Sequence, residues 1–239
     1  MSKLAQTRHL KSQRKSNLKN IRKKIKKPWP TKDAMEQVYE MHLWGNNNSK
    51  FYSGIGSHDP EIIAPYIAVV SSFLKSFKKP IIVCDLGCGD FNVGKNLVDF
   101  SLNYIAVDVV SHLINHNKNT FKNEKLEFQC IDIAVDCLPS GDCALIRQVL
   151  QHLSNTEVKQ IIDKLKKFKY VIVTEHIPNN AFIPNKEIIS GQGTRLKKQS
   201  GIDLLAPPFN FRVKEKRELL EIRPKNTKGV ITTTLYKVF

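Results

Sequence analysis

The sequence has 239 residues, with 41% apolar and 25% charged side chains, which fits one globular domain rather than two. No apolar run approaches the roughly 20 residues of a membrane-spanning helix, and the basic N-terminus lacks the apolar stretch of a secretory signal. None of the five cysteines forms a C-x-x-C pair, which argues against a disulfide framework and a structural zinc. We therefore expect a cytoplasmic protein with no metal site.

The formal charge of +16 is concentrated at the N-terminus. Residues 1–27 carry eleven Lys or Arg and no acidic residue, which leaves 27 basic and 22 acidic side chains in the rest. Dense like charge with few apolar residues predicts a flexible arm. Such an arm suits the phosphates of nucleic acid or the headgroups of an anionic membrane, where it would hold the protein peripherally, unless it serves solubility alone.

Residues 28–79 are interpreted as an N-terminal helical cover. A helix is expected over 31–43 with Thr31 as its N-cap, and a second helix over 60–77 with proline at a tolerated first-turn position. The stretch 44–60 is rich in Gly, Asn and Ser, which predicts a loop between them.

Residues 80–175 alternate between short apolar β-type runs and helical segments. This alternation is typical of a parallel sheet that is covered by helices on both faces. The expected strands are 81–85, 103–108, 126–131, 143–147 and 170–174, and the expected helices are 93–100, 110–119 and 154–167.

The last part of the chain departs from this alternation. Residues 176–211 are rich in Pro, Gly and Asn and are interpreted as an insertion. Residues 212–239 predict a C-terminal β-hairpin with strands over 218–222 and 230–238. We expect 28–239 to form a single domain behind the arm.

A glycine turn follows the first expected strand, in Asp85-Leu86-Gly87-Cys88-Gly89-Asp90. Glycines let the backbone turn sharply and approach a ligand closely, although a G-x-G turn alone is weak. Asp108 ends the second strand about twenty residues later, where a carboxylate can accept both hydroxyls of a ribose. Asp132 follows the third strand, and the carboxyl ends of parallel strands are where open α/β sheets bind ligands.

On these motifs the sequence resembles the class I S-adenosylmethionine-dependent methyltransferases. The resemblance rests on Val83-Cys84-Asp85-Leu86-Gly87-Cys88-Gly89, Ala106-Val107-Asp108, Cys130-Ile131-Asp132-Ile133 and Gln148-Val149-Leu150-Gln151-His152-Leu153, in that order. It implies a Rossmann-like, seven-stranded, mostly parallel sheet with an antiparallel C-terminal hairpin strand, helices on both faces, and S-adenosylmethionine as cofactor. It further implies that the insertion shapes the pocket of the methyl acceptor.

The resemblance also assigns cofactor-binding residues. Asp85, Gly87 and Gly89 would line the methionine end, Asp108 the ribose, and Asp132 with Ile133 the adenine. Aromatic faces attract a sulfonium cation, so Trp44 and the Tyr52–Gly54 stretch are expected to cover the site, unless they only pack onto the core. The full set is Trp44, Tyr52, Gly54, Asp85, Gly87, Cys88, Gly89, Asp108, Val109, Asp132, Ile133, Gln148 and Val149.

The glycine loop departs from the family at one position. The third glycine of the family motif is Phe91 here. A nicotinamide dehydrogenase, the rival interpretation, requires G-x-G-x-x-G, but the third position counted from Gly87 is Asn92 and Gly94 comes two residues late. The spacing therefore favours the methyltransferase.

Two histidines are candidate general bases. Methyl transfer to a hydroxyl needs a proton removed, and His176 and His152 follow the fifth and fourth strands. Each histidine could instead be a structural residue. Glu175, Arg195 and Asp203 are candidate substrate contacts, with ordinary loop salt bridges as the alternative for each.

The favoured function is O-methylation of a small or glycan-like acceptor. A nucleic-acid methyltransferase that uses the basic arm is the first alternative. The chain lacks the N/D-P-P-Y/F tetrapeptide, and Ala206-Pro207-Pro208-Phe209 resembles it only superficially. The second alternative is a non-catalytic binding module with a cofactor fold. Nothing in the sequence indicates an obligate protein partner.

Overall fold

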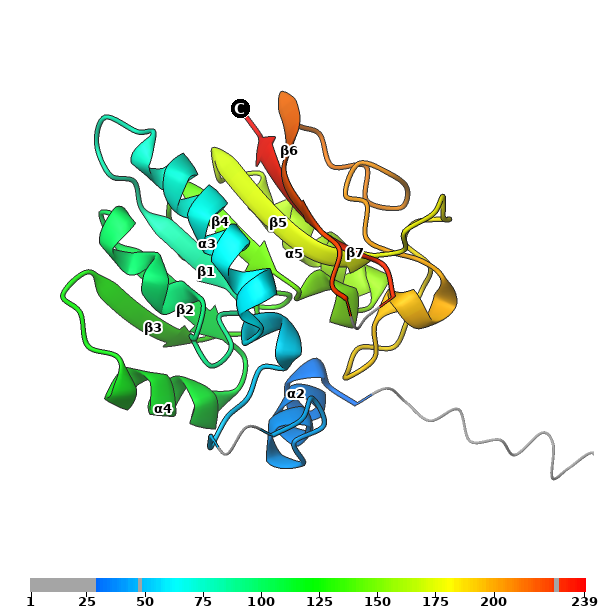
Figure 1. Cartoon of the computed structure of the whole chain (residues 1–239), viewed down its shortest axis with the longest axis horizontal. Helices are drawn as coiled ribbons and strands as arrows, with labels where there is room; N and C mark the ends of the chain where they lie inside the picture. The colour runs from blue at the N-terminus through cyan, green and yellow to red at the C-terminus, as the bar shows by residue number, and fades with distance from the viewer. Residues whose placement is uncertain (1–28, 47–48, 226–227) are drawn as a thin grey trace, which may run out of the picture.

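The computed structural model describes residues 29–46, 49–225 and 228–239, so the expected basic arm lies outside the described residues. Seven strands form one sheet in the order β3-β2-β1-β4-β5-β7-β6 (Figure 1). The strands are β1 Val83–Leu86, β2 Tyr104–Asp108, β3 Leu126–Cys130, β4 Cys143–Arg147, β5 Tyr170–Ile177, β6 Glu215–Ile222 and β7 Val230–Lys237. Strands β1 to β5 are parallel to one another, and β7 is antiparallel to both β5 and β6.

Helices cover both faces of this sheet. The α-helices are α2 Thr31–Glu40, α3 Pro60–Lys75, α4 Ser111–Thr120 and α5 Asn155–Leu165. Short 3-10 helices are η1 Ile55–Ser57, η2 Gly94–Asn96, η3 Val98–Phe100, η4 Leu150–His152 and η5 Arg195–Lys198. Helix α3 lies over one face and α5 over the opposite one, while α2 lies beyond the strand ends (Figure 1). The expected fold class, a Rossmann-like α/β sheet with an antiparallel hairpin strand, is confirmed.

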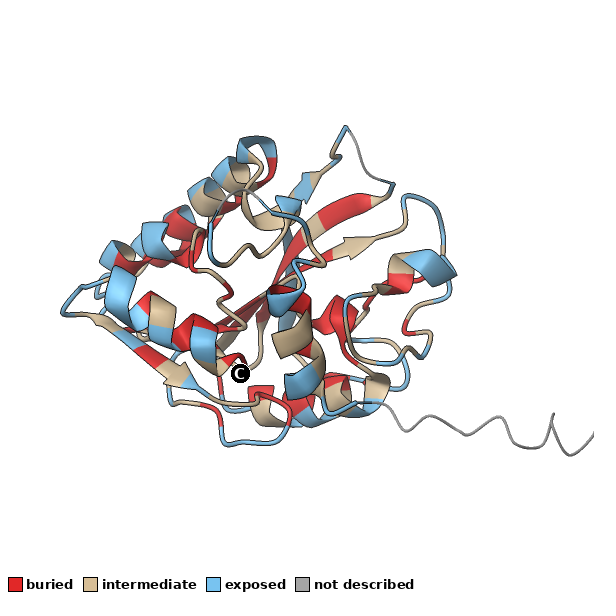
Figure 2. Ribbon diagram, turned by 90° about the horizontal axis from the view of Figure 1, so that it is seen from below, coloured by how far each residue is buried: buried red, intermediate tan, exposed pale blue. Residues whose placement is uncertain are grey.

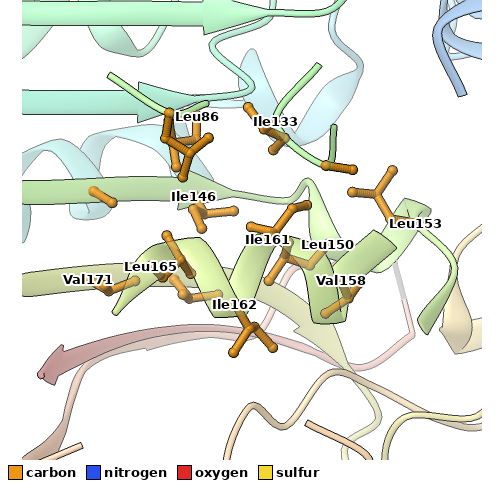
Figure 3. Close-up of a cluster of buried hydrophobic side chains, with 14 of the residues drawn as sticks. Leu86, Ile133, Ile146, Leu150, Leu153, Val158, Ile161, Ile162, Leu165 and Val171 are labelled. Carbon is orange, nitrogen blue, oxygen red and sulfur yellow. The ribbon is translucent and has the colours of Figure 1, made fainter. Parts of the chain in front are cut away.

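The central strands form because most of their side chains are apolar on both faces, and the whole of β1 is buried, including Asp85. Buried residues lie in the strands and on the inner sides of the helices (Figure 2). On one face, Val158, Ile161, Ile162 and Leu165 of α5 pack against the sheet (Figure 3). Helix α5 begins with a capping box, in which Ser154 and Glu157 satisfy each other's backbone N–H groups. These contacts fix the strand ends from which the site is built.

The C-terminal hairpin completes the sheet. Strand β5 continues to Ile177, three residues past the apolar run that predicts it, because β7 pairs with it along its whole length. Strand β6 likewise begins at Glu215, before the expected start at 218, since β7 supplies its hydrogen-bond partners. A register shift between Glu218 and Leu220 interrupts this outer pairing.

Two local expectations are wrong. The expected helix over 93–100 is instead a pair of short 3-10 helices, η2 and η3. The chain passes so close to Phe91 and Asp85 at Gly94 that a Cβ there would lie 2.5 Å from the Phe91 ring. Thr31 is not the N-cap of α2; Pro30 occupies that position, and the Thr31 hydroxyl donates to Glu157 of α5. Among the described residues, no helix combines the length and apolarity needed to span a membrane.

Candidate functional site

A cavity of about 330 Å³ opens at the carboxyl ends of β1, β2 and β4. This volume lies within the range of small-molecule sites. Its walls come from α2 and the segment after it, the glycine loop, the ends of the strands, and the 192–194 segment of the insertion. Of the residues expected to serve the cofactor or catalysis, the cavity brings together Trp44, Gly54, Asp85, Gly87, Cys88, Gly89, Asp108, Val109, Asp132, Ile133, Gln148, Val149 and His152.

The glycine loop has no room for side chains at its two glycines. Gly87 has φ +90° and Gly89 has φ +56°, a region that favours glycine. A Cβ at Gly87 would lie 2.5 Å from a methyl group of Val149, and one at Gly89 would lie 2.5 Å from the Ser53 hydroxyl oxygen. The backbone therefore forms the cavity wall here, as close approach to a ligand requires.

Asp108 at the end of β2 is oriented by backbone groups. Its carboxylate accepts the N–H of Gly89 at 3.0 Å and the N–H of Val110 at 3.1 Å. Burial raises the pKa of Asp108, while these N–H groups act in the opposite direction. Each carboxylate oxygen keeps acceptor capacity for a further donor, so the group fits a ribose diol.

The far end of the cavity combines a polar strand end with apolar walls. Asp132 accepts the N–H of Ala134 at 2.8 Å, and its own N–H donates to Asp136 at 2.8 Å. Ile133 is buried, and Val109 lies beside it in the cavity wall. A flat heteroaromatic ring with an amino group fits this combination.

A half-buried charged group that the sequence analysis did not identify lies at the opposite end. Arg147 at the end of β4 donates to the Ser57 hydroxyl at 3.1 Å and to the carbonyl of Gly56. Its guanidinium lies 5.1 Å from the centroid of the Tyr66 ring. Its buried Nε has no hydrogen-bond partner among the residues that the structure describes. Because Arg147 lines the cavity, its guanidinium can bind a ligand carboxylate there.

Asp85 is buried beneath the glycine loop and 8% exposed. It accepts the hydroxyl of Tyr104 at 2.9 Å. Burial raises the pKa of Asp85 to about 6, although the Tyr104 hydroxyl and the charge of Arg147 lower it. A carboxylate in this place can hold an ammonium group of a ligand.

Phe91, which stands where the family has a third glycine, is an anchor for the loop. It keeps the left-handed backbone conformation, with φ +61°. Its ring is fully buried and makes edge contacts with Tyr104, Phe121 and Phe128 at centroid distances of 4.8–5.8 Å. Aromatic packing thus holds a conformation that glycine adopts without strain.

The segment 51–58 is tied to the glycine loop through Asp90. The Asp90 carboxylate accepts the N–H of Ser53 at 2.8 Å and lies 2.6 Å from Nε2 of His58. In return, the Ser53 hydroxyl accepts the N–H of Asp90 at 2.8 Å. The ring of Tyr52, a residue expected at the cofactor, packs on the His58 ring with the two ring centroids 4.5 Å apart. Tyr52 is not among the described cavity-lining residues. The sequence analysis placed Ser53 and Asp90 in two separate motifs but did not predict their pairing, because the two residues are 37 positions apart.

His152 has one defined tautomer. Its Nδ1 lies 3.2 Å from the carbonyl oxygens of both Gly191 and Gly193, so Nδ1 carries the proton and Nε2 the lone pair. Burial lowers the pKa of His152 to about 4, although these carbonyls act in the opposite direction. The centroid of the Trp44 ring lies 5.1 Å from the centroid of the His152 imidazole. The Gln151 amide nitrogen lies 3.3 Å from Nε2, so an acceptor hydroxyl must displace this contact before the neutral imidazole takes its proton.

The other residues expected in catalysis or substrate binding are not among the described cavity-lining residues. His176 lies on β5 beside Gly229, and burial lowers its pKa. Glu175 and Arg195 are buried, and both form hydrogen bonds to backbone groups of the protein. Asp203 accepts the N–H of Leu205 within its own turn.

Comparisons with known proteins place this arrangement in a fold family. No protein-family model and no curated protein matches the sequence. The N-methyltransferase NodS from Bradyrhizobium japonicum WM9, solved with S-adenosylhomocysteine, is 11% identical, with a TM-score of 0.60 over 86% of this chain and 99% of that chain.

Two further solved structures have similar scores. An S-adenosylmethionine-dependent methyltransferase from Leishmania major is 16% identical, with a TM-score of 0.59 over 87% of this chain and 86% of that one. The 1,6-didemethyltoxoflavin-N1-methyltransferase of Burkholderia thailandensis, solved with its acceptor and S-adenosylhomocysteine, is 13% identical, with a TM-score of 0.58 over 87% of each chain. With the strand order of the sheet, these similarities show that the chain has the class I S-adenosylmethionine-dependent methyltransferase fold.

Proposed function

We propose that the protein is an S-adenosylmethionine-dependent methyltransferase. The observation that carries this proposal is one shared cavity. Its lining includes Gly87 and Gly89 after β1, Asp108 at the end of β2 and Asp132 after β3. Asp108 would bind the ribose hydroxyls, Asp132 with Ile133 the adenine, and Arg147 with Asp85 the carboxylate and ammonium of the methionine part. The bound cofactor supplies a methyl group on a sulfonium, which a nucleophile attacks in line.

We further propose that the acceptor is a neutral hydroxylated compound, either a small molecule or glycan-like. We name Trp44, His152, Gln192 and Thr194 the acceptor wall; these four cavity-lining residues are aromatic or neutral and polar. Arg195, which could have held an anion, is 1% exposed and binds protein groups only. A flat indole face beside neutral hydrogen-bonding groups suits a polyhydroxylated ligand better than a charged one.

In this mechanism His152 removes the proton of the acceptor hydroxyl. Its unprotonated Nε2 takes the proton as the oxygen attacks the methyl carbon, and the imidazolium then loses the proton to solvent. Burial lowers the pKa of His152 to about 4, so the imidazole is neutral at pH 7 but a weaker base than an ordinary histidine, and the proton moves to it only as the oxygen attacks. The acceptor wall would contribute further to the rate by holding the acceptor oxygen toward the methyl group of a bound cofactor.

The proposal is tested with methyl-labelled S-adenosylmethionine and a panel of mono- and oligosaccharides, small hydroxylated compounds, amines and polynucleotides. We expect label on a hydroxylated compound, a loss of about 100-fold or more in turnover for His152→Gln, and unchanged affinity for S-adenosylhomocysteine. His176→Gln is the matched control and should retain activity. Label on polynucleotides or amines alone would refute the acceptor class, and full activity of His152→Gln would refute the base.

A further inference from the structure

The turn that carries His152 begins with a strained residue. Gln148 follows β4 with φ +57°, a conformation that non-glycine residues adopt only when their surroundings enforce it. Its N–H donates to the carbonyl of Thr174 at 2.7 Å. Gln148, Val149 and His152 of this turn all line the cavity. Their placement therefore depends on what holds the turn.

Glu175 holds the turn by its N–H groups. One carboxylate oxygen accepts the N–H of Leu150 at 3.0 Å, and the other accepts the N–H of Gln151 at 3.0 Å. The side chain is 3% exposed, so both bonds are shielded from water. The carboxylate thus binds the start of η4 with both oxygens.

Arg195 holds the same turn by a carbonyl group. Its Nη1 donates to the carbonyl of Leu150 at 2.8 Å, and its Nη2 donates to the Asn155 side chain at 2.7 Å. Its Nε donates to the carbonyl of Lys186 at 3.1 Å. The guanidinium therefore joins η4, the start of α5 and the insertion at a single buried point.

The insertion and Gln151 then fix the imidazole itself. The N–H of Gly191 donates to the carbonyl of His152 at 3.0 Å, beside the two carbonyls that accept from Nδ1. The Gln151 side-chain oxygen accepts the N–H of His176 at 3.2 Å, which leaves its amide nitrogen 3.3 Å from Nε2 of His152. Both ring nitrogens therefore face groups that favour the Nδ1–H tautomer.

We infer that Glu175 and Arg195 are positioning residues for His152, and we call them the turn clamp. The clamp sets the tautomer and direction of the imidazole without touching cofactor or acceptor. This inference rests on the proposed function, in which His152 receives the acceptor proton. It gives a role in the reaction to two residues that the sequence analysis placed at the substrate.

The test records long-range proton–nitrogen NMR spectra of the full chain labelled with ¹⁵N-histidine, in which the two neutral tautomers have different nitrogen shifts. Spectra and turnover are both recorded at about pH 9, above the pKa of about 8 to which burial raises Glu175, so that both of its oxygens act as acceptors. His152→Gln assigns the signal. The native protein should show His152 as Nδ1–H alone. Glu175→Gln keeps one acceptor oxygen but places an amide NH₂ group opposite the second backbone N–H. Arg195→Lys keeps the positive charge but loses the planar guanidinium that donates to Leu150 and Asn155 together. Both variants should show mixed tautomers.

Turnover provides the second readout. Both clamp variants should lose about 100-fold in kcat while the KM for S-adenosylmethionine stays within twofold, since misplacement of a reacting group by about 1 Å has a cost of that size. Asp203→Asn is the matched control, because Asp203 also accepts a backbone N–H within the insertion but lies outside the clamp. It should leave tautomer and kcat unchanged.

Each outcome decides the inference. An unchanged tautomer or an unchanged kcat in folded clamp variants would overturn it, and if Glu175→Gln fails to fold, the result for Arg195→Lys decides alone. Failure of the native protein to bind S-adenosylhomocysteine would refute the proposed function instead, and the tautomer spectra would still decide whether the clamp orients His152.

Discussion

Gly89 is the residue at which the glycine loop tolerates least change. Its N–H donates to Asp108, its carbonyl accepts from the Asn117 side chain at 2.7 Å, and its φ of +56° disfavours any Cβ. We predict that Gly89→Ala lowers the affinity for S-adenosylhomocysteine at least tenfold and destabilises the fold by about 1–2 kcal/mol. Titration calorimetry and thermal unfolding measure the two effects.

Gly193→Ala is the control for this prediction. Gly193 lies between the cavity-lining residues Gln192 and Thr194, but a Cβ there would meet no described atom within 4 Å. The two variants should therefore differ clearly in affinity. Equal affinities would mean that the backbone at Gly89 does not approach the cofactor.

The raised pKa of Glu175 predicts that the free energy of unfolding depends on pH. Burial raises its pKa to about 8, against the lowering effect of the N–H groups that it accepts. Between about pH 4.5 and pH 8 the folded state keeps a proton that the unfolded state releases, so stability falls as pH rises, by at most about 1.4 kcal/mol per pH unit. Urea unfolding across this range should show a shallower fall for Glu175→Gln than for the native protein. Parallel curves for the two proteins would contradict the raised pKa.

For single residues, the sequence predicts a role correctly where that role depends on the position of the residue along a strand. Asp108 and Asp132 are identifiable because Asp108 ends β2 and Asp132 comes shortly after β3, and both line the cavity. Glu175 and Arg195 show the limit of such reasoning. Polar residues near strand ends look alike in sequence, and only the fold shows that these two bind the backbone of η4.

The segment 51–58 and the glycine loop act as one element because Asp90 joins them. Removing its carboxylate should loosen the segment at Ser53 and His58, since both contacts are lost, while Arg147 still holds Gly56 and Ser57. We predict that Asp90→Ala raises the dissociation rate of S-adenosylhomocysteine at least tenfold, with little change in the thermal stability of the unliganded protein. Stopped-flow displacement measures this rate.

Asp99→Ala serves as the control for Asp90→Ala. Asp99 lies in η3 and its carboxylate contacts the exposed Asn123. This variant should release the ligand at the native rate. A native dissociation rate in Asp90→Ala as well would show that the segment does not retain the cofactor.

The elements themselves were largely predictable, for a physical reason. Buried parallel strands need continuous apolar runs, so the bounds of β4 agree with the sequence at both ends and those of β1 within two residues. The stretch 93–100 was not predictable in this way. Its apolar spacing suits a helix, but Gly94 must pass within contact distance of Phe91 and Asp85, and the chain forms two tight turns there instead.

For the whole molecule, the charge distribution predicts a separable role of the N-terminus. Residues 1–27 carry eleven of the basic residues and Trp29 directly after them is 59% exposed. We propose that this segment binds anionic lipid surfaces, since each Lys or Arg near such a surface contributes about 1 kcal/mol. Deletion of residues 1–27 should abolish sedimentation with phosphatidylserine vesicles and leave S-adenosylhomocysteine binding unchanged.

Neutral phosphatidylcholine vesicles and a polynucleotide provide the comparison for the deletion. Native protein should sediment with anionic vesicles at low salt and detach as salt screens the charges. Binding that requires polynucleotide, or that survives the deletion, would contradict the lipid proposal.

The cofactor site is the central claim, and its most direct test is calorimetric titration of the full chain with S-adenosylhomocysteine, followed by thermal unfolding at a hundredfold excess over the dissociation constant. We predict one site per chain, a stabilisation of about 2.7 kcal/mol, and loss of both in Asp108→Ala. No heat and no stabilisation with S-adenosylhomocysteine or S-adenosylmethionine, together with binding of a nicotinamide cofactor, would contradict the cofactor assignment.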